Sequence, residues 1–235
     1  MKPVAVFRHS ATEGPGYFAT FLAARNIPLE LIRIDAGEAV PPDIGAYSGL
    51  VFMGGPMSVN DDLPWIPPVL DAIREAVRRD IPVLGHCLGG QLMAKALGGT
   101  VGRNPLKEIG WGEVQVLDNA EARAWFDGAP QHFLSFHWHG ETFTIPEGAT
   151  RILASPYCPN QAYALGKHLG MQCHVEMTRE MIEAWCAAGA QEIAAASGPA
   201  VQTPAQMAVG MEGKLAVLNG VAEKLYSHWI TGLKG

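Results

Sequence analysis

Apolar and polar positions follow two different rhythms along the first hundred residues. Short apolar runs, typical of strands buried on both faces, are followed by longer segments in which apolar residues recur every three or four positions, as on a helix. The predicted strands cover residues 3–8, 28–35, 49–55 and 81–85. The predicted helices cover residues 17–26, 65–80 and 91–97. Strands that alternate with helices indicate a parallel sheet covered on both faces.

The pattern changes after Gly99. Short alternating segments predict antiparallel strands at residues 111–118, 132–143, 150–155 and 162–166. A last strand and two helical stretches are predicted at residues 169–176, 177–190 and 204–230. Because there is no repeat or linker, we predict one domain over residues 1–235. Its fold class is α/β: a mostly parallel sheet flanked by helices (flavodoxin-like, three-layer), with added antiparallel strands and a helical C-terminal tail.

Composition and charge exclude several classes of protein. Hydrophobic residues make up 48% of the 235 residues and charged residues 17%, enough for a large core. The net charge of -6 argues against a nucleic-acid partner. No apolar run approaches the roughly 20 residues of a membrane helix, and the N-terminus lacks the features of a secretory signal. We therefore expect a cytoplasmic protein with no nucleic-acid or membrane partner.

The cysteines show no paired spacing, so we predict free thiols. They are Cys87, Cys158, Cys173 and Cys186. A zinc site can be imagined from a wider set of side chains. These are His137, His139, Cys158, Cys173 and His174. None of them forms the closely spaced ligand pairs typical of zinc, so we predict no metal.

The segment PVLGHCLGGQ places Cys87 between a predicted strand and a predicted helix. Side chains at Gly85 and Gly89 would crowd such a turn. A helix that begins after Cys87 directs its N–H groups and positive dipole end at the sulfur, which favours a reactive thiolate. A buried structural cysteine is the alternative. The strand–turn–helix setting favours a nucleophile elbow.

A thiol nucleophile needs a base and a group that orients the base. His174 and Glu176 lie two residues apart on a predicted strand and so share a face, where the carboxylate can hold the imidazole. The N–H groups of Gly55, which ends another predicted strand, and of Leu88 are placed to form an oxyanion hole. Taken singly, a solvated His–Glu pair and an ordinary turn remain the alternatives.

Three motifs follow one another along the chain: GGP at residues 54–56, GHCLGGQ at 85–91 and QCHVE at 172–176. In this order, and on this α/β pattern, they resemble the class I glutamine amidotransferases with a Cys-His-Glu triad. The resemblance covers roughly residues 1–180. It implies that Cys87 is the nucleophile, His174 the base and Glu176 the orienting acid. It also implies that Gly55 and Leu88 are the oxyanion donors.

The resemblance extends to the substrate pocket with departures. It implies that Gln91 lines the glutamine pocket. The segment HWHGE, with His137 and His139, resembles the family's His-Gly-Asp segment beside that pocket; a plain strand is the alternative. Many members carry a hydrophobic residue in place of His86 and a histidine in place of Gly90, which affects expectations about substrate more than about catalysis.

The implied reaction is hydrolysis of the side-chain amide of glutamine through a γ-glutamyl thioester, without a cofactor. The family passes the ammonia to a synthase, and this sequence has no phosphate-binding loop for one. We therefore expect either a partner synthase subunit or a hydrolase of γ-glutamyl amides or peptides that acts alone. A non-catalytic binding protein with this fold is a further alternative. Another cysteine-protein family with the same elbow would leave the QCHVE motif unexplained.

Overall fold

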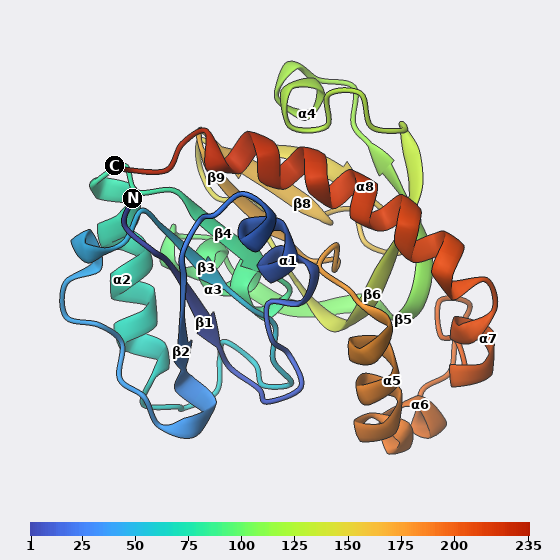
Figure 1. Cartoon of the computed structure of the whole chain (residues 1–235). Coiled ribbons are helices and arrows are strands. Elements are labelled where there is room, and N and C mark those ends of the chain that lie inside the picture. Colours follow the sequence, from blue (N-terminus) through green and yellow to red (C-terminus); the bar gives the residue numbers. More distant parts are fainter.

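A nine-stranded sheet runs through the centre of the computed structural model, which describes residues 1–235 (Figure 1). The strand order is β2-β1-β3-β4-β9-β8-β7-β5-β6. Parallel pairing joins β2 (Leu29–Arg33), β1 (Val4–Arg8), β3 (Gly49–Phe52), β4 (Val83–His86) and β9 (His168–Met171). Antiparallel pairing adds β8 (Ala162–Leu165), β7 (Thr150–Ala154), β5 (Val101–Val116) and β6 (His132–Phe143). The predicted α/β fold with added antiparallel strands is therefore confirmed.

Alternate residues of the central strands enter two hydrophobic cores, one on each face of the sheet. Along β1, Val4 and Val6 pack with residues of α1 and α8, whereas Ala5 and Phe7 pack with residues of α2 and α3. Figure 1 shows α8 lying across one face of the sheet, and α2 beside the end of the sheet that is formed by β2 and β1. The helices are α1 (Gly16–Ala24), α2 (Ile66–Arg78), α3 (Leu88–Ala96), α4 (Ala120–Trp125), α5 (Arg179–Ala188), α6 (Ala190–Ala195), α7 (Pro204–Ala208) and α8 (Met211–Ile230). Short 3-10 helices span Ile34–Ala36 and Ile44–Ala46.

Several predicted boundaries were wrong. The predicted strand over residues 169–176 ends at Met171, because the chain turns there toward β6. The strand predicted from residue 111 begins at Val101, and α4 was not predicted. The helical tail breaks before α8 at Gly210, whose φ of 65° is left-handed and interrupts the helix.

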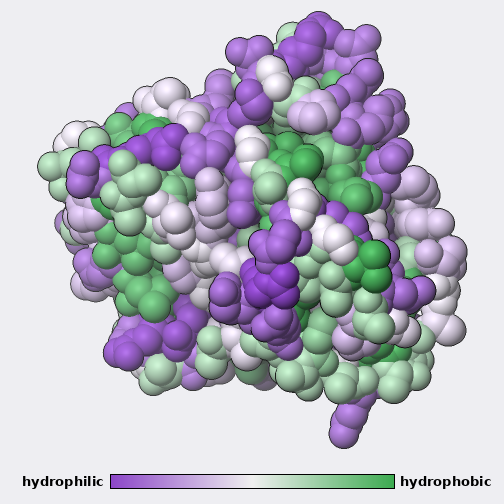
Figure 2. Space-filling view, turned by 45° about the vertical axis from the view of Figure 1, so that its right-hand side comes forward, coloured by the Kyte–Doolittle hydropathy of each residue, from purple (hydrophilic) through white to green (hydrophobic).

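The surface in Figure 2 mixes hydrophilic and hydrophobic residues, with hydrophilic residues gathered at the top, where α4 lies. All four cysteines are free, as predicted. None of the helices combines the length and apolar character needed to span a membrane.

Candidate active site

Cys87 occupies the sharp turn between β4 and α3. Its φ is 49°, a strained value for a residue with a side chain. The turn needs its glycines: a Cβ at Gly89 would lie 1.9 Å from the carbonyl oxygen of Phe52, and one at Gly85 would lie 2.4 Å from the backbone of Gly89. The helix α3 begins at Leu88, directly after the sulfur-bearing residue, so its positive dipole end faces the thiol.

His174 and Glu176 lie together after the end of β9. Nδ1 of His174 is 2.6 Å from Oε1 of Glu176, and each side chain is 1% exposed. Their geometry does not come from a shared strand face, as the sequence suggested. Instead, the N–H of His174 donates to the carbonyl oxygen of Phe136 at 2.8 Å, which anchors this loop to β6.

The charges of this pair are set by their burial and by each other. Burial by itself lowers the pKa of His174, but Glu176 and the thiol of Cys87 outweigh burial, so its pKa lies well above the usual value. Burial by itself raises the pKa of Glu176. The neighbouring imidazoles of His86 and His174 outweigh burial and lower the pKa to about 2. A carboxylate next to a protonated imidazole is the resulting state. Nε2 of His174 has no hydrogen-bond partner.

Two residues to which the sequence analysis gave no role in the triad lie behind the pair. Nε2 of His86 is 3.7 Å from Oε2 of Glu176 and 3.0 Å from the hydroxyl of Tyr226, on α8. Burial lowers the pKa of His86, and the neighbouring Glu176 opposes this shift. Through Tyr226, α8 of the helical C-terminal tail therefore reaches the site.

A cavity of ≈ 650 Å³ opens in front of Cys87. Gly55, Gln91 and His139 line it, whereas His137 does not. The N–H of Gly55 donates no hydrogen bond within the chain, and that of Leu88 is among the N–H groups that a helix start leaves unpaired.

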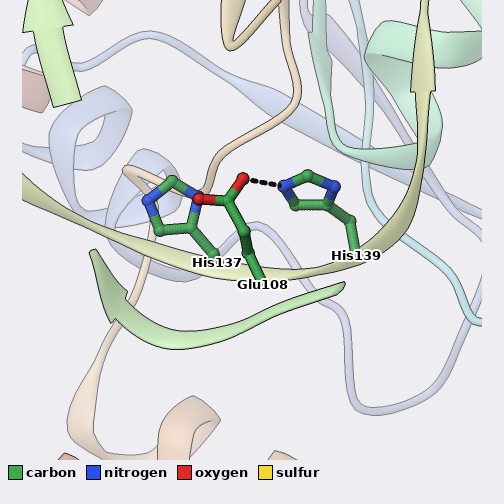
Figure 3. A group of neighbouring side chains, drawn as sticks. All are labelled: Glu108, His137 and His139. Carbon is green, nitrogen blue, oxygen red and sulfur yellow. Dashed lines mark hydrogen bonds and ion pairs between the residues drawn. The ribbon is translucent and has the colours of Figure 1, made fainter. Parts of the chain in front are cut away.

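His137 and His139 lie on either side of Glu108, a residue not predicted for the site (Figure 3). The potential ligand atoms of the three lie within 4.8 Å of one another, and two imidazoles with a carboxylate are a donor set that zinc accepts. Cys158, Cys173 and His174, which completed the zinc site imagined from the sequence, do not belong to this group.

The carboxylate of Glu108 is already engaged by other donors. It accepts hydrogen bonds from Ser155 and Gln161 at 2.9 and 2.7 Å, and from Nε2 of His139 at 3.0 Å. Nδ1 of His139 donates to the carbonyl oxygen of Glu141 at 3.0 Å. Both ring nitrogens of His139 are thus taken up by hydrogen-bond partners within the chain, and neither is directed at a metal. This network fixes His139 in the cavity wall.

Three further side chains, to which the sequence analysis gave no role, lie near Cys87 and His174. Nε2 of Gln172 lies 3.5 Å from the sulfur of Cys87, and Trp185 packs edge-on against His174 with ring centroids 4.8 Å apart. Glu13, in the loop after β1, also lines the cavity. Gln172 stood within the QCHVE motif, but Trp185 and Glu13 come from distant segments with no local signal.

The family model "Glutamine amidotransferase class-I" matches residues 18–183. The chain belongs to this family. The glutamine amidotransferase-like protein YfeJ of Salmonella typhimurium is 31% identical to this amidotransferase-family chain, over 81% of the chain and 82% of YfeJ. A glutamine-hydrolyzing GMP synthase of Aeropyrum pernix is 37% identical over 72% of the chain, which spans only 34% of that synthase.

Solved structures of the family superpose over nearly the whole chain. A glutamine amidotransferase from Methylobacillus flagellatus is 45% identical with a TM-score of 0.97, covering 100% of this chain and 96% of that one. A glutamine amidotransferase from Thermotoga maritima is 28% identical with a TM-score of 0.87, covering 97% of each chain. The similarity therefore includes the tail beyond residue 183.

Proposed function

We propose that this protein hydrolyses the side-chain amide of glutamine, with Cys87 as nucleophile, His174 as base and Glu176 as the residue that orients the base. The observation that carries the proposal is the buried 2.6 Å hydrogen bond between His174 and Glu176, beside a cysteine on a left-handed turn that opens into a cavity. Family membership supports the same reaction.

In the proposed reaction, the thiolate of Cys87 attacks the amide carbon and forms a carbon–sulfur bond. The N–H groups of Gly55 and Leu88 hold the oxyanion. Protonated His174 gives its proton to the amide nitrogen, the carbon–nitrogen bond breaks, and ammonia leaves a γ-glutamyl thioester. Neutral His174 then takes a proton from water, whose oxygen attacks the thioester and releases glutamate and the thiolate. Every proton moves through His174, so no metal or cofactor is needed.

The substrate side chain is placed by the polar wall of the cavity. Gln91 donates to the side-chain oxygen of Gln172 at 3.1 Å, which holds both amides beside Cys87. His139 is fixed in the same wall. We assign Gln91 and His139 to substrate binding. We assign no substrate contact to His137, which is buried outside the cavity lining and contacts the carbonyl oxygen of Gly112 at 3.4 Å.

The fate of the ammonia separates two versions of this function. The GMP synthase relative is about twice as long as this chain, and its name describes glutamine hydrolysis joined to synthesis. We propose that a separate synthase takes the ammonia from this chain. The second version is a γ-glutamyl amide or peptide hydrolase that acts alone. The cavity favours it, because ≈ 650 Å³ falls within the range of about 300–1,000 Å³ that accommodates drug-sized ligands.

Two expectations about the whole chain remain proposals. One domain over residues 1–235 is supported by the uninterrupted nine-stranded sheet. A cytoplasmic location is supported by four free thiols, which a reducing compartment preserves.

An electrophilic glutamine analogue tests the reaction directly. We expect one adduct, on Cys87, together with ammonia release from glutamine by the unlabelled protein. Cys186→Ala is the matched control, because Cys186 is the one cysteine that is partly exposed, and it should keep both the adduct and the activity. Cys87→Ala should lose both. Labelling that persists in Cys87→Ala would refute the assignment.

A further inference from the structure

The carboxylate of Glu13 lies in the cavity and has no role in the proposed reaction. Its loop follows the carboxyl end of β1, the edge at which ligands bind in open α/β sheets. The loop is held in place from two sides: Nε1 of Trp185 donates to the carbonyl oxygen of Thr12 at 2.8 Å, and the N–H of Tyr17 donates to that of Glu176, also at 2.8 Å. Glu13 therefore sits on a fixed part of the site.

The side chain of Glu13 reaches the reacting groups over Gly54. A Cβ built on Gly54 would lie 2.1 Å from Oε2 of Glu13 and 3.3 Å from Cε1 of His174. The carboxylate and the imidazole thus meet above the same glycine, and a larger residue would separate them. The side chain of Glu13 makes no hydrogen bond or ion pair within the chain, although it lies in the lining of a cavity with Cys87.

The charge of the cavity wall favours a cation at this position. Three glutamates line the cavity: Glu13, Glu141 and Glu192. The single lysine of the lining, Lys107, is ion-paired with Glu192 at 2.5 Å. Lining arginines are absent. Apart from the protonated His174 beside it, Glu13 therefore has no cationic side chain in the cavity wall to neutralise it.

We propose that Glu13 forms a subsite that binds a primary ammonium group of the substrate. The inference rests on the proposed function, because it concerns the substrate of the same cysteine site. The ammonium has two chemical sources: the α-ammonium of the γ-glutamyl part, or an amine carried by the leaving group. Glu13 is a specificity-determining residue in either case, since it contacts the substrate away from the amide that is cleaved.

The ionisation of Glu13 agrees with this role. Burial raises its pKa to about 7; His174 lowers the pKa and Glu176 raises it. A carboxyl group that ionises near neutral pH binds a cation better as the pH rises. The preference for an ammonium-bearing substrate should therefore increase through about pH 7 in the unmodified protein and stay flat in Glu13→Gln.

The test compares kcat/KM in the wild type and in Glu13→Gln for two pairs of substrates. The first pair is L-glutamine and glutaramate, which keeps the amide but lacks the α-ammonium. The second is the γ-glutamyl amide of a short diaminoalkane and that of the matching alkylamine. Glu147→Gln, the same substitution at an exposed site outside the cavity, is the control and should change none of the four values.

We expect Glu13→Gln to lower kcat/KM by about tenfold or more for the ammonium-bearing member of one pair. The other member of that pair should change by less than about threefold, and the affected pair identifies the source of the ammonium. An equal loss for all four substrates, or no loss for any, in a variant with the wild-type circular dichroism spectrum would overturn the proposal. If the wild type cleaves no substrate in a Cys87-dependent way, the proposed function fails instead.

Discussion

The substitution Glu176→Gln isolates the orienting role proposed for this carboxylate. It keeps the size of the side chain and removes the charge that lies 2.6 Å from Nδ1 of His174. A hydrogen bond to a charged group contributes about 1.5–3 kcal/mol, and both partners here are 1% exposed, so solvent cannot replace the interaction. This range corresponds to a loss of about 10–150-fold in kcat/KM. Removal of the base in His174→Ala should cost more, about 10²–10⁴-fold.

The pH profile provides a second readout of the same substitution. Glu176 raises the pKa of His174, and in the proposed reaction protonated His174 is the acid that releases ammonia. Activity should therefore fall as the pH rises through the pKa of His174. Without the carboxylate, this limb of the profile should move to lower pH. A variant with only a packing defect would lose activity without moving the limb.

The assay is the initial rate of ammonia release from glutamine across pH, with circular dichroism and the melting temperature as checks of folding. Glu147→Gln is the matched control, because the same change is made at an exposed residue. A loss in Glu176→Gln as large as that in His174→Ala would show that the carboxylate does more than orient the base. An unchanged rate and profile would remove Glu176 from the mechanism.

Three further predictions concern stability. Burial lowers the pKa of His9 and of His137 to about 4, so between pH 6.5 and 4 these histidines are protonated in the unfolded chain but neutral in the folded chain. Urea unfolding at pH 5 should therefore show about 2 kcal/mol less stability per histidine than at pH 7, and equal stability would contradict this. Gly89→Ala should cost about 3 kcal/mol or more through its backbone clash, whereas Gly220→Ala, in open space on α8, should stabilise by about 0.5–1 kcal/mol in the same melting assay. Tyr226→Phe removes the hydroxyl bonded to a buried imidazole and should destabilise by about 1–3 kcal/mol, a result that a neutral calorimetric measurement would refute.

The periodicity of the sequence predicted the strands and helices of the parallel half, because each strand there is buried on both faces and each helix has one apolar side. It failed near residues 169–176, where strand propensity continues past Met171 but the backbone leaves its neighbours β4 and β8 and forms a bridge to β6 instead. Local pattern does not contain this event, since it depends on a partner strand more than thirty residues away.

Local sequence determined the elbow itself. The glycines around Cys87 and the helix that follows act over a few residues, so the motif predicted the turn and the position of the sulfur. His174 and Glu176 were identified through their spacing, although the loop geometry that joins them differs from the strand face that was expected.

Only the tertiary structure decided which other groups surround the candidate triad. Glu13 comes from the first loop, Trp185 from α5 and Tyr226 from the last helix, and each is an ordinary residue in its own segment. The parallel sheet brings the carboxyl ends of β1, β4 and β9 to one edge, while α8 packs back across the face between them. Side-chain chemistry at such an edge is set by long-range packing, which a single sequence does not encode as a local pattern.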